Sequence, residues 1–331
     1  MNLTRGDKGA GMKTFDPSYR DFGEFLEGVT DAVWQQRGLA AGVGRFYHPE
    51  TIQRRGDGIS FGAGEVAAVA LADLAAMPDR MLMTEDMVWC GDAARGYLGA
   101  QRVLSRAVHT GPGIWGPPTG KRVLWREMVE SYAKDSRISD EWRICDTGGV
   151  IRQLGGEARD WARARLPLCD PASQPLRPEV DAPGPYTGRG NDNRWGAAFA
   201  GILERIVAAD IAVIADQYDR ACQVDYAGGR GGHGHGAAEA FWMGLRSAFP
   251  SATFTLHHSI GIEAPLMPPR AALRWSLDGR HDGWGLFGAP SGAEVHVMGM
   301  SHAELGPGGV RREWTLIDEA AVWMQVLRAT G

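Results

Sequence analysis

The chain repeats itself at a fixed distance along the sequence. Residues 113–123 (GIWGPPTGKRV) recur as residues 285–295 (GLFGAPSGAEV), and residues 141–146 (EWRICD) recur as residues 313–318 (EWTLID). Both pairs are 172 residues apart, since 285 minus 113 and 313 minus 141 give the same value. The register holds without a gap from Gly64 to Gln153. A repeat of this length predicts two copies of one domain and not a solenoid unit.

A proline-rich stretch separates the copies, with prolines at positions 167, 171, 175, 178, 183 and 185. Prolines at this density disfavour helices and central strands and favour an extended spacer. We therefore expect a first domain at residues 12–166, a linker at 167–189 and a second domain at 190–331.

The charge balance limits the classes of partner. The formal net charge is -5, and there is no basic cluster of the kind that nucleic-acid binding requires. The sequence shows neither a signal peptide nor an apolar run long enough to span a membrane. The four cysteines have no spacing typical of disulfides or metal sites. Free thiols of this kind are typical of proteins in a reducing compartment. We expect a cytoplasmic protein that binds neither nucleic acid nor membrane.

Each copy begins with a helical pattern. Apolar residues spaced three and four apart predict a first helix, capped by Asp16 in the first copy and by Asn191 or Asp192 in the second. A second helix is predicted in each copy, over Glu65–Met77 and Ala237–Phe249.

Four strands follow the second helix of each copy. They are expected at residues 81–90, 101–109, 122–131 and 137–146, and again at 253–262, 273–281, 294–305 and 310–318. Helices followed by hairpin-connected strands predict an α+β class in which a curved antiparallel sheet wraps round the N-terminal helices. Such a cone-shaped sheet encloses a ligand pocket.

Two histidines occur at equivalent positions in the copies. His109 and His281 end strands whose apolar face carries them towards the interior. They are candidate catalytic residues; the alternative is that each imidazole bonds to the backbone near its strand end.

Two aspartates are the candidate acid/base residues. Asp146 and Asp318 follow Trp142 and Trp314 by four residues, so tryptophan and carboxylate share a strand face. A carboxylate beside an indole in an apolar cavity has a raised pKa, which suits a general base. The alternative is that each aspartate caps the following turn or helix.

Other polar residues and glycine-rich stretches are candidate binding groups. His302 shares a strand face with His296, Met298, Met300 and Glu304, and the alternative is that this is the face of an edge strand. Its equivalent in the first copy is Glu130, so the two pockets would differ chemically. The sequence at 116–121 departs from a phosphate-binding loop, and the glycine-rich stretch at 228–236 departs from a dinucleotide fingerprint. The histidines at 233, 235, 257 and 258 are not expected to form a metal site.

The order of these motifs resembles one family. The run from Val108 to Val123, followed by residues 137–142, Asp146 and Gln153-Leu-Gly155, resembles the SnoaL-like polyketide cyclases. The second copy resembles the same ending through residues 309–314, Asp318 and Gln325, but its turn is a weaker match at Ala293 and Glu294.

The resemblance implies a nuclear-transport-factor-2-like fold and chemistry without a cofactor. It gives Asp146 and Asp318 the role of acid/base in an intramolecular aldol ring closure, with His109 and His281 assisting. A small apolar or polycyclic ligand would contact a set of aromatic and histidine side chains: Trp115, Trp142, Phe287, Trp314, His302, Tyr47 and Tyr218. It also implies an internal pseudo-dimer and leaves further homo-oligomerisation open.

Three functional hypotheses follow. The chain is a cyclase-like proton-transfer enzyme, or a carrier or sensor that only binds a ligand, or a protein with one catalytic and one structural copy. Isomerases, dehydratases and hydrolases share this scaffold. Replacing Asp146 and Asp318 by asparagine, singly and together, separates these hypotheses.

Overall fold

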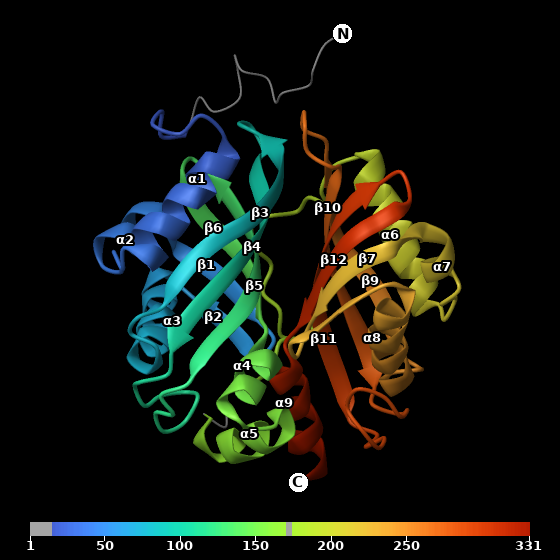
Figure 1. The fold of residues 1–331 in the computed structure, drawn as a ribbon. Helices are drawn as coiled ribbons and strands as arrows, with labels where there is room; N and C mark the ends of the chain where they lie inside the picture. Colours follow the sequence, from blue (N-terminus) through green and yellow to red (C-terminus); the bar gives the residue numbers. More distant parts are fainter. Residues whose placement is uncertain (1–14, 170–173) are drawn as a thin grey trace. The chain divides into compact units, whose positions relative to one another are not determined.

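The computed structural model describes residues 15–169 and 174–331. These residues form two compact units (Figure 1). Unit 1 contains the described residues up to Arg55, Ile59–Arg143 and Ala182–Gly190; unit 2 contains Gly56–Gly58, the described part of Ile144–Asp181, and Asn191–Gly331.

The first copy contributes helices and one six-stranded sheet. Its elements are α1 (Phe22–Val29), the π-helical turn η1 (Thr30–Gln35), α2 (Ala41–Phe46), β1 (Tyr47–Arg55), β2 (Gly58–Phe61), α3 (Ala63–Ala76), β3 (Met81–Asp92), β4 (Gly96–Val108), β5 (Arg122–Lys134) and β6 (Arg137–Cys145). The sheet order is β2-β1-β6-β5-β4-β3. Strands β3 to β6 are antiparallel neighbours, as predicted, whereas β1 pairs with β6 in parallel.

The apolar stripe of the first helix packs on this sheet. Phe22, Phe25, Leu26 and Val29 are buried on α1, and Val33 continues the stripe on η1. The N-cap is Asp21, whose side chain accepts a hydrogen bond from the Glu24 N–H at 2.9 Å. The prediction of Asp16 as the cap is wrong: the Asp16 carboxylate accepts from the Ser18 N–H in a turn that precedes the helix.

The second copy repeats this order. Its elements are α6 (Arg194–Val207), α7 (Val213–Gln217), β7 (Tyr218–Tyr226), β8 (Arg230–His233), α8 (His235–Ala248), β9 (Thr253–Ile262), β10 (Arg270–Arg280), β11 (Glu294–Gly306), β12 (Gly309–Ile317) and α9 (Glu319–Thr330). The sheet order β8-β7-β12-β11-β10-β9 matches that of the first copy element for element. Its first helix is capped by Asn193, which corrects the prediction of Asn191 or Asp192.

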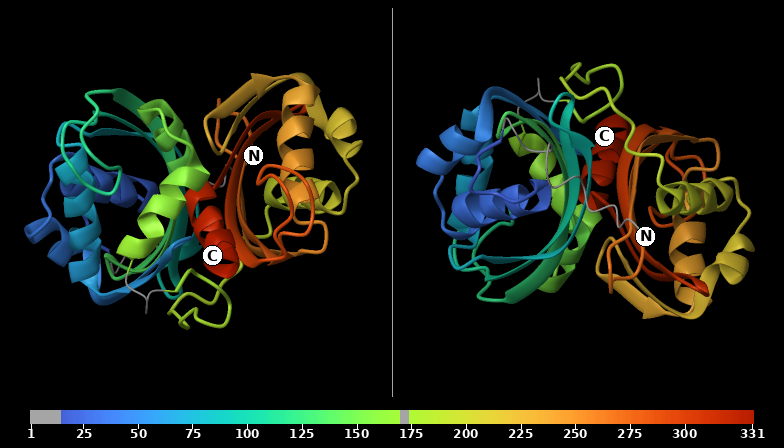
Figure 2. Two further views of the ribbon diagram at one scale, coloured as in Figure 1. Left: turned by 90° about the horizontal axis from the view of Figure 1, so that it is seen from below. Right: turned by 90° about the horizontal axis from the view of Figure 1, so that it is seen from above.

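The duplicated α+β architecture is confirmed, and in each unit the sheet curves round its helices (Figure 2). The hairpins β1–β2 and β7–β8 are additions that the period-two pattern did not reveal, and they make both sheets mixed. Helices α4 (Thr147–Leu154) and α5 (Ala158–Arg165) and the 3-10 turn η2 (Leu166–Leu168) belong to unit 2, where α5 packs against α9. The boundaries 12–166 and 190–331 stay a prediction. In the described residues no helix is long and apolar enough to cross a membrane.

The duplicated turn motif forms a tight loop between β4 and β5 in the first copy and between β10 and β11 in the second. Gly116 and Gly288 have φ values of 96° and 74°, in the left-handed region that favours glycine. The backbone oxygen of His109 accepts hydrogen bonds from the N–H groups of Thr119 and Gly120. The loop is therefore closed onto the end of β4, which explains why its glycines recur.

Candidate functional site in unit 1

A cavity opens inside unit 1 between its helices and the concave face of its sheet. It has a volume of about 30 Å³, the space of one or two water molecules. One part of its wall is apolar, and the remainder carries hydroxyl, amide and charged groups. The lining residues are Leu26, Val29, Thr30, Trp34, Tyr47, Leu82, Gln101, Val103, Glu127, Val129, Ser131, Ile138, Glu141 and Arg143.

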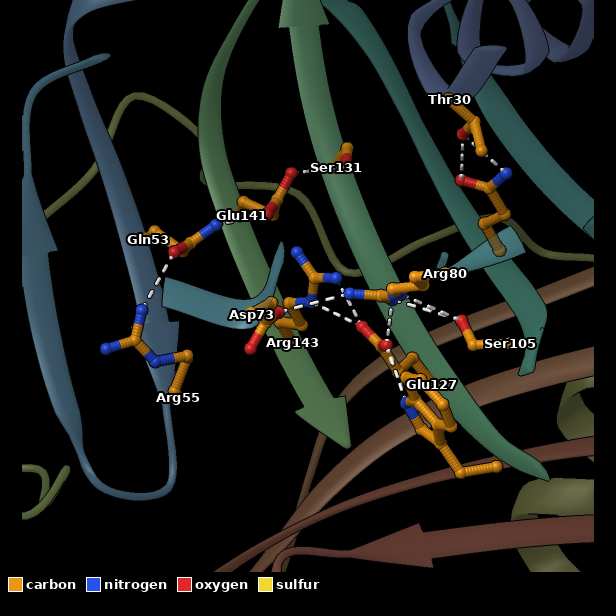
Figure 3. Close-up of polar contacts among 12 residues, drawn as sticks. Thr30, Gln53, Arg55, Asp73, Arg80, Ser105, Glu127, Ser131, Glu141 and Arg143 are labelled. Carbon is orange, nitrogen blue, oxygen red and sulfur yellow. Dashed lines mark hydrogen bonds and ion pairs between the residues drawn. The ribbon is translucent and has the colours of Figure 1, made fainter. Parts of the chain in front are cut away.

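The first polar cluster centres on Glu127 of β5, which two guanidinium groups enclose (Figure 3). Arg143 donates from Nε to Oε2 at 2.7 Å and also bonds through Nη2, while Arg80 bonds to Oε1. The Trp125 indole N–H donates to Oε1 at 2.9 Å. Burial alone would raise the pKa of Glu127, but Arg143 and Arg80 overcome it and hold the pKa at about 2. Glu127 is therefore a fixed anion at neutral pH.

Arg80 links this cluster to helix α3. Its Nη1 donates to the Asp73 carboxylate at 3.1 Å, and its Nη2 donates to Ser105 Oγ at 3.0 Å. Burial raises the pKa of Asp73, and the opposing charge of Arg80 moderates that rise. Arg80 itself does not line the cavity, so it acts on the cavity through Glu127.

Arg143 turns one edge of its guanidinium towards the cavity. Nε and Nη2 are taken by Glu127, and among the described residues Nη1 has no hydrogen-bond partner. The guanidinium carbon lies 4.4 Å from the centre of the Trp34 ring. Burial lowers the pKa of Arg143, but Glu127 and Glu141 outweigh it and raise the pKa overall. The cavity thus contains a permanently charged donor with a free edge.

The second polar cluster centres on Glu141, two residues before Arg143 on the same face of β6. Its carboxylate accepts from Tyr47 Oη at 3.2 Å, from Ser131 Oγ at 3.2 Å and from Gln53 Nε2 at 2.6 Å. These donors are neutral, and within the described residues no arginine or lysine forms an ion pair with Glu141. It is a buried, well-oriented carboxylate at the cavity wall.

The second copy keeps this glutamate and loses the charges around it. Glu313, the equivalent of Glu141, accepts hydrogen bonds from four neutral donors: Tyr218 (2.8 Å), Tyr226 (2.7 Å), Trp242 (3.2 Å) and Thr315 (2.7 Å). Burial raises the pKa of Glu313 although these bonds oppose it. At the offset of 172, Glu127 becomes Gly299, Arg143 becomes Thr315 and Arg80 becomes Ala252.

Aromatic side chains fill the corresponding interior of unit 2. Trp242 and Trp275 are fully buried, with ring centres 5.9 Å apart. They replace Ala70 and Val103 of the first copy. The Trp275 indole donates to Ser301 Oγ at 3.0 Å, so its polar group is satisfied within the core.

The candidate aspartates lie at helix starts. Asp146 is the N-cap of α4, and its carboxylate accepts from the N–H groups of Gly149 (3.0 Å), Gly228 (2.5 Å) and Gly229 (3.1 Å). Burial raises the pKa of Asp146, and these three bonds oppose the rise. Asp318 caps α9 through the Ala321 N–H and accepts from Thr147 Oγ1 at 2.6 Å. Neither aspartate lines the cavity of unit 1.

The candidate histidines fasten the duplicated loops. His109 Nδ1 lies 3.2 Å from Thr119 Oγ1, and His281 Nδ1 lies 3.0 Å from Ser291 Oγ. Both imidazoles are fully buried, and their Nε2 atoms have no hydrogen-bond partner among the described residues. Burial lowers the pKa of His281.

The expected ligand contacts are spread over both units. Tyr47 lines the cavity. The Trp142 ring instead makes a cation–π contact with Arg54, whose guanidinium carbon lies 4.7 Å from the ring centre. In unit 2, Phe287 packs on Phe249, and Tyr218 donates to Glu313. Three further candidates lie outside the cavity lining: Trp115, His302 and Trp314.

No metal centre is formed by the residues that the structure describes, since no group of three or more histidine, cysteine, aspartate or glutamate side chains is placed to hold an ion. His235 Nε2 instead lies 3.1 Å from the Tyr218 backbone oxygen, and His257 Nε2 lies 2.9 Å from Ser276 Oγ.

Sequence reasoning missed Glu127, Glu141 and Arg143. Charged residues within strands are usually solvent-facing, and the aspartate motif drew attention to the opposite face of β6. The available signal was the recurrence of Glu141 as Glu313, one residue before each tryptophan of the repeat.

Residues 25–154 match the family model of the SnoaL-like polyketide cyclases. Over this range the first copy is similar to that family. The matched range contains the whole polar part of the cavity, from Thr30 to Arg143.

Several solved structures are similar to part of the chain. A SnoaL-like polyketide cyclase from Agrobacterium tumefaciens is 20% identical, covers 40% of this chain and 97% of its own, and has a TM-score of 0.34. TsrD from Streptomyces laurentii is 20% identical over 41% of this chain and 97% of its own, with a TM-score of 0.36. IdmH from Streptomyces antibioticus is 22% identical over 40% of this chain and 97% of its own, with a TM-score of 0.35. No curated protein matches the chain.

Proposed function

We propose that the SnoaL-like domain of the first copy is a proton-transfer enzyme of the cyclase type acting on a small carbonyl compound, with Glu141 as the acid/base. The observation that carries this proposal is the pairing of Glu141 and Arg143 on one face of β6, at one cavity. Glu141 offers a carboxylate without an ion pair. Arg143 offers a charged guanidinium whose Nη1 edge is left to donate to a ligand.

Glu127 is a poor candidate for the base. Its pKa of about 2 makes the carboxylate a weak proton acceptor, and its lone pairs are used by two arginines and an indole. Its role is to hold the Arg143 guanidinium in place. General-base catalysis favours a carboxylate such as Glu141, whose partners are neutral donors that orient it.

The charges around the cavity suit enolate formation. Two cations (Arg80 and Arg143) lie among three carboxylates (Asp73, Glu127 and Glu141). When Glu141 takes a proton from the carbon next to a carbonyl, the total charge is unchanged, because the negative charge moves to the substrate oxygen. A fixed guanidinium stabilises that oxygen without reorganisation.

Ring closure follows by the same groups. The enolate carbon forms a bond to a second carbonyl carbon of the same molecule, and the resulting alkoxide takes back the proton from Glu141. One carbon–carbon bond forms, one carbonyl becomes a hydroxyl, and no electrons enter or leave. If the proton returns to a different carbon, the same site is an isomerase.

Deuterium exchange tests the proton-transfer step without knowledge of the natural substrate. Small ketones and keto esters are incubated with the full chain in D₂O, and loss of the α-proton signal is followed by NMR. We expect exchange above the uncatalysed rate for at least one compound, and loss of that excess in Glu141→Gln. Exchange that is no faster than in buffer for every compound would contradict the proposal.

A further inference from the structure

We propose that Gln101 and Thr30 form a second polar anchor in the same cavity, so that the ligand is a small hydroxy-carbonyl compound. This inference rests on the proposed function, since it places the carbonyl oxygen at Arg143. It places a hydroxyl of the ligand as a hydrogen-bond donor to Gln101, at the other end of the ligand, and makes Gln101 a specificity-determining residue.

The Gln101 amide is fixed by its neighbours. Nε2 donates to Thr30 Oγ1 at 2.9 Å and to Thr84 Oγ1 at 2.8 Å, which uses both amide hydrogens. Thr30 Oγ1 in turn lies 3.0 Å from the Leu26 backbone oxygen, to which it donates. Gln101 is buried at 6% exposure and lines the cavity.

What remains on Gln101 is an acceptor. Its Oε1 lies 3.2 Å from Thr30 Oγ1, whose single hydrogen is shared with the Leu26 oxygen. An amide oxygen accepts two hydrogen bonds, so Oε1 can accept another from a ligand. It therefore selects a hydroxyl or amine and not a second carbonyl.

The two polar ends of the cavity are complementary. Thr30 lies at one side of the close-up, and Glu141 lies at the other (Figure 3). Arg143 can only donate, and Gln101 is left only to accept. The wall between these groups includes apolar side chains such as Val103 and Leu82, which suit a short carbon chain. The cavity of about 30 Å³ holds one or two water molecules, so a polycyclic ligand is excluded and a four-carbon ligand requires the lining side chains to move apart.

The second copy lacks the equivalent of Gln101, as it lacks the equivalents of Glu127 and Arg143. At the offset of 172, Gln101 becomes Leu273 and Thr84 becomes Leu256. Leu273 is fully buried in β10, so this strand position accepts leucine within the same fold. The amide is therefore not needed to fold the sheet, and its presence in the first copy is explained by the cavity.

The inference is tested by measuring the binding of two ligands to the wild type and to Gln101→Leu. The probes are 4-hydroxy-2-butanone and 2-butanone, and their dissociation constants are measured by NMR titration of the full chain. We expect the wild type to bind the hydroxyketone about fivefold more tightly, the size of one added neutral hydrogen bond. Gln101→Leu should bind both probes equally while keeping the wild-type affinity for 2-butanone. Gln36→Leu, at an exposed glutamine of the same unit, is the matched control and should keep the preference.

Three results would overturn the inference: a preference for the hydroxyketone that survives in Gln101→Leu, equal binding of both probes by the wild type, or no binding of either probe. None of them coincides with failure of the proposed function, which is read from α-proton exchange in Glu141→Gln. If exchange depends on Glu141 but the wild type shows no preference for the hydroxyketone, the proposed enzymatic function stands and the role of Gln101 as an anchor is wrong.

Discussion

The indole of Trp275 lies against Gly299, its partner across strands β10 and β11. A β-carbon at residue 299 would come within 2.2 Å of the Trp275 ring. In the first copy the equivalent cross-strand pair is Val103 and Glu127, and both line the cavity. This pair of substitutions is one of several that separate the polar cavity of the first copy from the aromatic core of the second. This difference supports the hypothesis of one catalytic and one structural copy.

Trp275→Val should destabilise the protein without creating a second active site. Removing a fully buried indole leaves a void that the core cannot close, at a cost of about 3–5 kcal/mol. Chemical denaturation measures this loss. NMR titration with 4-hydroxy-2-butanone should give one bound ligand per chain in the variant and in the wild type. A loss below about 1 kcal/mol would show that Trp275 does not fill the interior.

Glu127→Gln should be strongly destabilising, because it leaves Arg80 and Arg143 buried without their shared anion. Breaking one partner of a buried ion pair costs about 3–5 kcal/mol. Asp92→Asn, which breaks an exposed ion pair with Arg95, is the matched control and should leave stability nearly unchanged, because solvent screens this pair. Equal effects of the two variants on the unfolding midpoint would contradict the assigned role of Glu127.

The acid stability of the wild type should depend on the same carboxylate. Its pKa is about 2 in the folded protein, against an ordinary value of 4.5. A lowered pKa means that the unfolded chain binds the proton more tightly, so the contribution of Glu127 is complete above pH 4.5 and is lost as the pH falls towards 2. Denaturation curves across this window should show a steeper loss of stability in the wild type than in Glu127→Gln.

Thr119→Val should loosen the β4–β5 loop and leave exchange activity intact. The substitution removes the hydroxyl that holds His109 Nδ1 while keeping the imidazole. We expect a loss of about 1 kcal/mol of stability, the usual worth of one such bond. A large loss of exchange with unchanged stability would instead support a catalytic role for His109.

The sequence predicted the duplication and most of its elements, because both depend on local patterns. The 172-residue register, the apolar stripe from Phe22 to Val33 and the proline after α3 are properties of neighbouring residues. The parallel strand β1 was missed because its pairing with β6 joins segments about 90 residues apart and leaves no periodic signal of its own.

The site was harder to predict than the fold. Asp146 lies just beyond the end of β6 and caps α4, so the alternative of a helix cap is confirmed for this residue. The cavity lies on the face of β6 that carries Glu141 and Arg143. Which face of a strand is enclosed depends on the helices packed against it. The partners of Glu127 come from separate parts of the chain, so only the tertiary structure brings Arg80 and Arg143 together.

The most direct test compares two carboxylates by a single measurement, the rate of α-proton exchange in D₂O catalysed by Glu141→Gln and by Asp146→Asn. Both variants replace a buried carboxylate by its amide, and thermal unfolding confirms that each is folded. The account predicts that Glu141→Gln loses at least a hundredfold in exchange rate, as expected for removal of a general base. Asp146→Asn should keep the wild-type rate, because its carboxylate caps α4. Loss of exchange in Asp146→Asn with retention in Glu141→Gln would contradict it.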